Sequence, residues 1–240
     1  MDLLPVILTI ITASTPLLLA ATGELITEKS GVLNLGVEGM MLIGAIAAFA
    51  TAVSTGSALL AILAGAFSGA LVASIFAVLT LIFLANQVAT GLALTIFGVG
   101  LSALIGSNFV GIALEPLPKL NVDGLSTIPI LGKILFNHDV LVYLSFGMIF
   151  LVGWFLSKTR AGLILRAVGE SHDSAHALGY SIITVRYLAV IFGGFMSGLG
   201  GSYLSLVYTP LWAENMTAGR GWIALALVVF GTWRAGRVAF

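Results

Sequence analysis

Long apolar runs constrain this chain more than any other feature of its sequence. Runs that approach or exceed about 18 residues recur along the 240 residues, and each is long enough to cross a bilayer as a helix. Only 8% of the residues are charged, whereas a soluble domain has about 25%. A closed β-barrel would instead show short alternating segments. The sequence therefore predicts an all-α, polytopic membrane helix bundle that forms a single domain over residues 1–240.

Seven membrane spans can be drawn through the apolar runs. They are predicted at Leu3–Thr22, Gly36–Val53, Ala58–Leu84, Val88–Ile105, Val140–Leu156, Tyr187–Val207 and Trp222–Thr232. The third span is so long that it must tilt or break, and the last is short, which leaves room for a start before Trp222. Residues 238–240 resemble the start of a further span, so we expect the chain to be truncated at its C-terminal end.

The polar stretch between the first two spans is a candidate site. Glycines interrupt it, and Asn34 and Glu38 fall at or inside the edge of the second span. A carboxylate deep in the bilayer is costly, so Glu38 should face a partner, water or the protein interior. Either the segment is re-entrant and lines a passage, or it is a cytoplasmic turn with Glu38 near a helix N-terminus. We expect a broken or re-entrant segment over residues 23–39, with a structural role for Glu38.

A second group of polar residues, Asn86, Gln87 and Thr90, interrupts an otherwise apolar run. Amide side chains can hydrogen-bond a neutral polar ligand, or they can turn the chain between two spans. We favour the turn. Lining of a solute pathway by these three residues, and by Asn34 and Glu38, is the alternative.

The distribution of basic residues predicts an orientation. If the loop at residues 157–186 is cytoplasmic, seven of the ten Lys and Arg residues lie inside and three, Lys119, Lys133 and Arg220, lie outside. Residues 106–139 then form an outer loop, in which prolines break any long helix. This loop either caps a pathway or meets an external partner, or it is a disordered connector.

The cytoplasmic loop contains a short helix with a signal at each end. Ser171 can cap its start, and Gly179 can end it in the left-handed conformation. About two turns remain, and a helix so short is marginal in water. We therefore expect it to dock through Ala175 and Leu178, either on its own membrane helices or on another protein.

The sequence lacks the usual motifs of enzymes, metal-binding proteins, P-loop ATPases and nucleic-acid-binding proteins. The chain has no cysteine, no P-loop pattern and no nucleophile–base arrangement, and a net charge of zero gives no nucleic-acid footprint. His172 and His176 are four residues apart but have no further metal ligand in reach. We thus predict no catalytic residues, metal or cofactor. Gly65 and Gly69, and Gly194 and Gly198, have the spacing of close helix contacts, but the high glycine content alone explains any single pair.

Three motifs resemble a known family. They are Gly23-Glu-Leu-Ile-Thr-Glu-Lys-Ser-Gly-Val-Leu-Asn-Leu-Gly-Val-Glu-Gly-Met-Met-Leu-Ile-Gly-Ala45, Asn86-Gln-Val-Ala-Thr-Gly-Leu-Ala-Leu-Thr95 and Arg166-Ala-Val-Gly-Glu-Ser-His-Asp-Ser-Ala-His-Ala-Leu-Gly179. Together they resemble ABC-importer inner-membrane permeases of the branched-chain amino acid, ribose and simple-sugar family, closest to the nucleoside and simple-sugar branch. The third motif resembles the loop that docks on the ATPase, which places Arg166, Glu170, Ala175, Leu178 and Gly179 in the coupling region.

The resemblance implies partners and a location. It implies a cytoplasmic ATP-binding subunit, a second permease subunit and an extracytoplasmic solute-binding protein, around a multi-pass chain in the lipid bilayer of a prokaryotic cell membrane. ATP hydrolysis would then belong to the separate subunit, and this chain would not be an enzyme.

The expected function is ATP-driven import of a small polar solute. The central parts of the predicted spans carry no Asp, Glu, Lys or Arg, which favours a neutral or zwitterionic solute, and the resemblance points to a nucleoside or simple sugar. The alternative is a secondary transporter that works without an ATPase. It would normally need an ion-coupling acid near the membrane centre, although backbone carbonyls can also bind sodium.

Overall fold

The helices of this chain follow the apolar runs closely. The structure is a computed structural model that describes residues 3–121, 134 and 136–239. Its longer helices are α1 (Leu3–Lys29), α2 (Val37–Thr55), α3 (Ala58–Ala77), α4 (Gln87–Gly106), α6 (Val140–Lys158), α7 (Arg160–Glu170), α9 (Ile182–Tyr203) and α10 (Arg220–Phe230). The shorter elements are η1 (Val78–Ile82), η2 (Ser107–Phe109), β1 (Leu120–Asn121), β2 (Asn137–His138), α8 (His172–Ala177), η3 (Leu204–Tyr208) and α11 (Ala235–Val238). The predicted all-α, polytopic bundle is confirmed.

Within the described residues, six helices are long and apolar enough to cross a membrane. The seventh predicted span is α10, which has 11 residues and does start before Trp222. The long third span continues from α3 directly into the π-helix η1, and together they form one 25-residue apolar segment.

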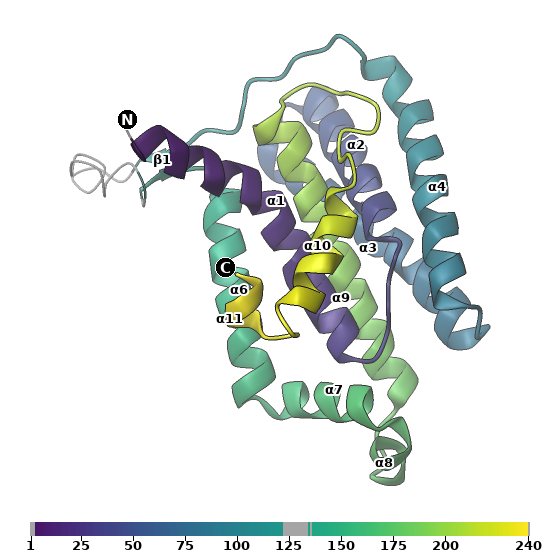
Figure 1. Ribbon diagram of the computed structural model, residues 1–240. Coiled ribbons are helices and arrows are strands. Elements are labelled where there is room, and N and C mark those ends of the chain that lie inside the picture. The colour runs from purple at the N-terminus through teal and green to yellow at the C-terminus, as the bar shows by residue number, and fades with distance from the viewer. Residues whose placement is uncertain (1–2, 122–133, 135, 240) are drawn as a thin grey trace.

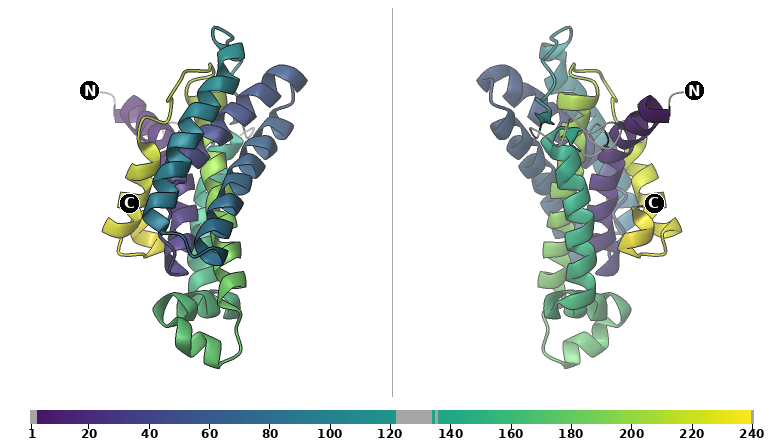
Figure 2. Two further views of the ribbon diagram at one scale, coloured as in Figure 1. Left: turned by 90° about the vertical axis from the view of Figure 1, so that its right-hand side faces the viewer. Right: turned by 90° about the vertical axis from the view of Figure 1, so that its left-hand side faces the viewer.

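Helix α9 runs through the middle of the bundle and packs against α1, α2 and α3. Helices α7 and α8 protrude from one end of the elongated molecule, which we call the α7–α8 end (Figures 1 and 2). Helix α6 leads to this end and α9 leads away from it, so α7 and α8 lie between two spanning helices (Figure 1).

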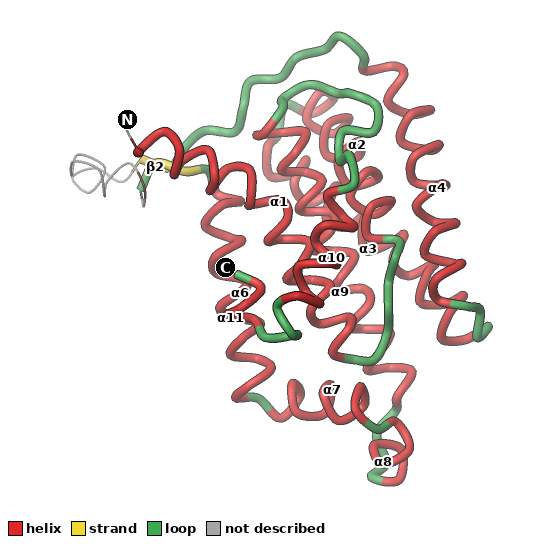
Figure 3. Tube along the Cα trace, viewed as in Figure 1, coloured by secondary structure: helices red, strands yellow, loops and turns green. Residues whose placement is uncertain are grey.

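The chain re-enters the bundle twice. After α1, residues 30–36 run back along the bundle before α2 begins, and after η3, residues 209–219 do the same before α10 begins (Figure 3). Both α2 and α10 therefore start inside the bundle. From there α2 runs away from the α7–α8 end and α10 runs toward it (Figure 1). The predicted re-entrant segment is confirmed for residues 30–36.

The first part of that predicted segment is helical, which corrects the expectation for residues 23–29. Helix α1 continues through Gly23 to Lys29. Gly23 serves a helix contact here, because a Cβ on it would lie 2.8 Å from the carbonyl oxygen of Gly193 in α9. A glycine that permits close packing has the same sequence signature as one that breaks a helix.

The two glycine pairs form one contact between α3 and α9. A Cβ on Gly69 would lie 2.3 Å from the carbonyl oxygen of Gly194, and a Cβ on Gly198 would lie 2.2 Å from that of Gly65. The interpretation that glycine frequency alone explains these motifs is wrong. The glycine pair of α3 packs against the glycine pair of α9, and the absence of side chains lets the two backbones approach closely.

The predicted outer loop at 106–139 is described at its two ends only. Residues 122–133 and 135, which include Pro129 and Lys133, lie outside the described residues. Strands β1 and β2 pair antiparallel and join the two described ends. The first end packs on the re-entrant residues 209–219, through a bridge between Ala113 and Leu211 and a 2.8 Å bond from the Leu114 N–H to the Pro210 carbonyl.

We predict that Gly69→Ala lowers the free energy of unfolding by about 1–3 kcal/mol, because the new methyl group must push α3 away from α9. Gly147→Ala is the matched control, since a Cβ on Gly147 in α6 meets nothing within 4 Å. Thermal unfolding in detergent measures both variants. Equal transition temperatures for the two would contradict the α3–α9 contact.

Candidate functional site

The carboxylate of Glu38 ties the start of α2 to the start of α10. Glu38 is the second residue of α2 and is only 4% exposed. Its Oε1 accepts hydrogen bonds from the Thr217 hydroxyl at 2.5 Å and the Gly219 N–H at 2.7 Å, and its Oε2 accepts from the Gly221 N–H at 2.6 Å. The N–H groups at a helix start have no partner within the helix and favour negative charge. The expected structural role of Glu38 is therefore confirmed, and the helix start that it caps is that of α10.

The backbone before α10 is shaped to surround this carboxylate. Asn215 and Ala218 adopt positive φ angles of 54° and 48°, which are uncommon without glycine. Gly219 follows with φ of 84°. A Cβ on Gly221 would lie 2.6 Å from the Glu38 Cα, so only glycine allows the two helix starts to approach this closely.

Arg220 lies in this cluster, which corrects its predicted place in an outer loop. It is the first residue of α10 and is flanked by the two glycines whose N–H groups bind Glu38. Its Nη1 donates to the carbonyl oxygens of Met216 and Thr217, and its Cζ lies 5.4 Å from the centroid of the Tyr208 ring. Hydropathy missed this position because α10 was assigned from its apolar residues only. The pattern Gly-Arg-Gly directly before an apolar run was the available signal.

Side chains satisfy the backbone donors of the first re-entrant segment. The Leu33 N–H donates to Gln87 Oε1 at 2.9 Å, and the Asn34 N–H donates to Glu24 Oε1 at 3.3 Å. Glu24 is buried in α1 and was not among the predicted site residues. Irregular backbone at membrane depth is tolerated only where such partners or water are available.

The same segment is fitted against α4. Thr95 donates to the Leu35 carbonyl at 3.0 Å, and Asn34 Oδ1 accepts from the Gly36 N–H at 3.0 Å. A Cβ on Gly91 would lie 2.8 Å from the Leu35 nitrogen. Asn34 is buried and turns the chain into α2, so in this structure it has a structural position and does not face an open cavity.

The second group of polar residues, Asn86, Gln87 and Thr90, lies at a turn between two helices, which is the interpretation that we favoured. Asn86 precedes α4 as its N-cap, and its Oδ1 accepts from the Ala89 N–H at 3.0 Å. Gln87 reaches the first re-entrant segment, as described above, and Thr90 is partly exposed in the first turn of α4. The structure thus places Gln87 against the re-entrant segment that contains Asn34, whereas Glu38 faces α10.

Helix α8 has the predicted start and end. Ser171 Oγ accepts from the Ser174 N–H at 3.4 Å, and Gly179 has a φ of 85°. The two residues of the predicted docking face differ, because Ala175 is 1% exposed whereas Leu178 is 74% exposed. Helix α8 folds back on α7 and α9, which buries Ala175 within this chain, so Ala175 follows the alternative of docking on the chain's own helices. Leu178 remains exposed.

Helix α7 was not predicted, although its sequence signals it. Thr159 Oγ1 caps its start by accepting from the Gly162 N–H at 3.0 Å. Gly162, Leu165 and Val168 are buried at a spacing of three residues, and this places them on one face of a helix. A cap followed by that spacing is an amphipathic helix signal. The surrounding arginines suggested a loop instead.

The other predicted coupling residues lie at the same end. Arg166 in α7 is partly exposed, and its Nε is buried without a hydrogen-bond partner in the described structure. Glu170 is exposed at the end of α7, and a Cβ on Gly179 would meet nothing within 4 Å. Besides these residues, the α7–α8 end exposes two leucines, Leu163 at 58% and Leu178 at 74%.

Helix α7 also touches the base of the first re-entrant segment. A Cβ on Gly169 would lie 2.1 Å from the Lys29 carbonyl oxygen, and Arg186 at the start of α9 donates from Nε to the Ser30 carbonyl at 3.0 Å. The turn that follows α1 is therefore held between α7 and α9.

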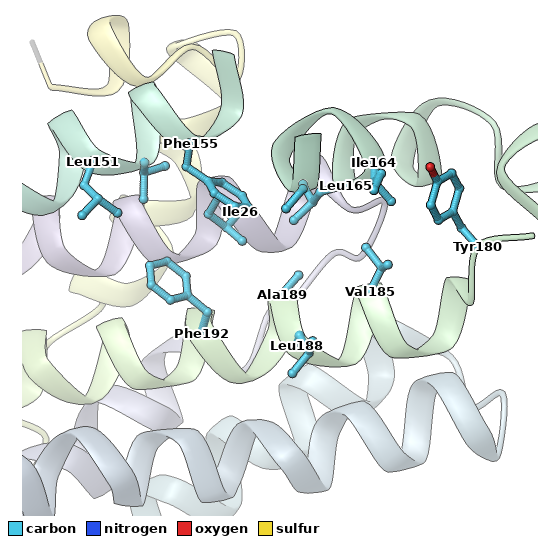
Figure 4. Close-up of a pocket in the computed structure, with 12 residues that line it drawn as sticks. Ile26, Leu151, Phe155, Ile164, Leu165, Tyr180, Val185, Leu188, Ala189 and Phe192 are labelled. Carbon is cyan, nitrogen blue, oxygen red and sulfur yellow. The ribbon is translucent and has the colours of Figure 1, made fainter. Parts of the chain in front are cut away.

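An apolar pocket of about 410 Å³ lies above α7, between α1, α6 and α9 (Figure 4). Phe155, Leu165 and Phe192 line it, and the Tyr180 hydroxyl is the polar group at its edge (Figure 4). A site for a small polar solute needs several convergent polar groups, so this pocket is unsuited to one. In the described part of the chain, no group of three or more His, Cys, Asp or Glu side chains could hold a metal ion.

Comparison with known proteins agrees with this architecture. A family model described as the permease component of the branched-chain amino acid transport system matches residues 6–239. The chain is 42% identical over 230 residues to a Haloferax volcanii protein named "Putative glucose ABC transporter permease protein TsgC13", covering 94% of this chain and 70% of that protein. No solved structure matches the chain.

Two bacterial relatives carry nucleoside names. The guanosine ABC transporter permease protein NupQ of Bacillus subtilis is 33% identical, over 97% of this chain and 78% of its own length. The nucleoside ABC transporter permease protein NupC of Lactococcus lactis is also 33% identical, over 92% of this chain and 73% of its own.

These matches define the class of this membrane helix bundle. The chain belongs to the branched-chain amino acid and simple-sugar family of ABC-transporter permeases. It is a multi-pass protein of the prokaryotic cell membrane and the permease subunit of an importer. Membership implies an ATP-binding partner and a solute-binding partner.

We predict that Glu38→Gln lowers the free energy of unfolding by about 1.5–3 kcal/mol. The amide NH₂ that replaces one carboxylate oxygen cannot accept a hydrogen bond, so it would face a donor that this oxygen binds. Glu115→Gln is the control, since Glu115 is exposed in the outer loop. Thermal unfolding in detergent compares the two. A Glu38→Gln transition within error of the wild type would mean that the carboxylate does not hold α2 to α10.

Proposed function

We propose that this chain imports a nucleoside or a simple sugar, with the energy supplied by ATP hydrolysis on a separate subunit. The names of its relatives, which include glucose, guanosine and nucleoside permeases, support these two solute classes. The sequence has no P-loop pattern, which supports a separate ATPase. The chain itself then performs no chemical reaction.

The α7–α8 end is the proposed docking site for the ATP-binding subunit, on the cytoplasmic side. The observation that carries this assignment is Leu178, a leucine that is 74% exposed on a helical end that projects from the bundle. Exposed apolar side chains bordered by polar residues are typical of a protein contact. Arg166, Glu170 and Gly179 are the other proposed coupling residues of this end, whereas Ala175 positions α8 from inside.

Movement of this end has a direct route to the middle of the bundle. Gly169 in α7 packs on the turn at Lys29, and the re-entrant segment leads from that turn to Glu38. A displacement of α7 by the ATPase would then shift the start of α2 and, through Glu38, the start of α10. Rigid-body rocking of packed helices is a known type of switching transition.

A second permease subunit completes the proposed pathway. Asn34, Glu38, Asn86 and Gln87 hydrogen-bond to backbone groups of this chain, and the second subunit would complete the surface that contacts solute. An extracytoplasmic solute-binding protein would deliver the solute at the end opposite α7 and α8. The two permease chains are either identical or closely related.

We predict ATP-dependent uptake of radiolabelled guanosine or glucose by the assembled transporter in proteoliposomes. Uptake should require ATP in contact with the ATPase side and should not respond to an imposed proton or sodium gradient. A secondary transporter would show the opposite dependence. Gradient-driven uptake without ATP would therefore overturn the proposed energy source.

We predict that Leu178→Asp reduces association with the ATP-binding subunit at least tenfold, because it places a charge in the apolar centre of the contact. Leu59→Asp is the matched control, since Leu59 is 67% exposed at a helix end on the opposite side of the bundle. Co-purification and solute-stimulated ATPase activity measure the effect. Unchanged association of the Leu178→Asp variant would exclude α8 as the docking element.

A further inference from the structure

Arg220 places a positive charge at the start of a helix that begins inside the bundle. Its neighbour Gly221 donates to Glu38 at the start of α2, so both helix starts lie at the same level (Figure 1). Charged side chains at membrane depth are costly and almost always face a bundle interior or a water-filled cavity. Arg220 nevertheless remains partly exposed on this chain.

The guanidinium is only partly satisfied by its own chain. Its Nη1 donates to the carbonyl oxygens of Met216 at 3.2 Å and Thr217 at 3.0 Å. In the described structure, no carboxylate lies within 4.0 Å of it, because the Glu38 oxygens are directed to Thr217 and to backbone N–H groups. Its Nε and Nη2 have no hydrogen-bond partner among the described residues.

The side chain is also held in one orientation. Its Cζ lies 5.4 Å from the centroid of the Tyr208 ring, which suits a cation–π contact, and the two bonds from Nη1 fix the other side. Tyr208 is itself exposed and ends the π-helix that precedes the second re-entrant segment. A guanidinium with free donor nitrogens would be costly against lipid, so it should face water or another protein group.

We propose that Arg220 faces the translocation pathway and binds the passing solute through its free Nε and Nη2. The chemical class is an uncharged polar solute with hydroxyl or carbonyl oxygens, because the guanidinium offers only donors. Sugar hydroxyls and nucleoside oxygens share this chemistry. The inference rests on the proposed import function and adds a solute-contacting residue that the hydropathy pattern had placed outside.

Cysteine labelling tests whether Arg220 faces water. These 240 residues contain no cysteine, so Arg220→Cys adds a single thiol to them. In the assembled transporter in proteoliposomes, a membrane-impermeant thiosulfonate should modify it at least tenfold faster than Phe150→Cys. Phe150 is an apolar α6 residue that is 79% exposed on this chain. Equal rates would overturn the pathway assignment.

Uptake tests whether Arg220 binds solute. Uptake of guanosine and uptake of glucose are measured in separate assays. We expect Arg220→Met to raise the KM about tenfold for the solute that is transported. Arg220→Lys should raise this KM less than Arg220→Met does. Arg237→Met is the matched control, because Arg237 is exposed and bonded to Thr232 in the turn after α10. A normal KM in the Arg220→Met variant of an active transporter would overturn the assignment.

The two measurements separate failure of this inference from failure of the proposed function. If the wild-type complex takes up neither probe, the proposed function fails, and labelling still decides whether Arg220 faces water. If the wild type transports with ATP while the Arg220→Met variant behaves normally, only the role of Arg220 fails.

Discussion

The hydrogen bonds between Glu38 and the start of α10 are the interaction on which the arrangement of this bundle depends. Two helices that begin inside a membrane protein leave unpaired N–H groups where no lipid can satisfy them. One carboxylate accepts from the Gly219 and Gly221 N–H groups and from Thr217, so it satisfies α10 with a side chain of α2. The same contact therefore fixes the starts of two helices that run in opposite directions (Figure 1).

Glycine makes this arrangement possible in two different ways. At Gly69 and Gly198 the absence of a side chain lets α3 and α9 approach without distortion of either helix. At Gly219 it allows a positive φ, and at Gly221 it lets the carboxylate reach the backbone. A bundle with few charged residues relies on such close contacts, because no hydrophobic driving force brings helices together within lipid.

The sequence predicted the spans well, since apolar length reports directly on membrane crossing. It also predicted the re-entrant segment and the structural role of Glu38, because a carboxylate among apolar residues demands an internal partner. It could not identify that partner, since the residues around Thr217 are distant in the chain and carry no periodic signal. It could not decide for a similar reason whether Ala175 packs on its own chain or on another protein, because helix periodicity does not show which face a chain folds back upon. The roles of the coupling and pathway residues remain predictions.

The position of α7 links the proposed docking end to the first re-entrant segment. Its Gly169 lies against the carbonyl of Lys29, and Arg186 of α9 binds the next carbonyl, so the turn after α1 cannot move independently of α7. Beyond that turn the extended segment is fixed by hydrogen bonds to α1 and α4, which makes it a stiff connection and not a slack loop. If the ATP-binding subunit docks at α8 as we propose, this connection is the route by which a displacement of α7 would reach the Glu38 contact.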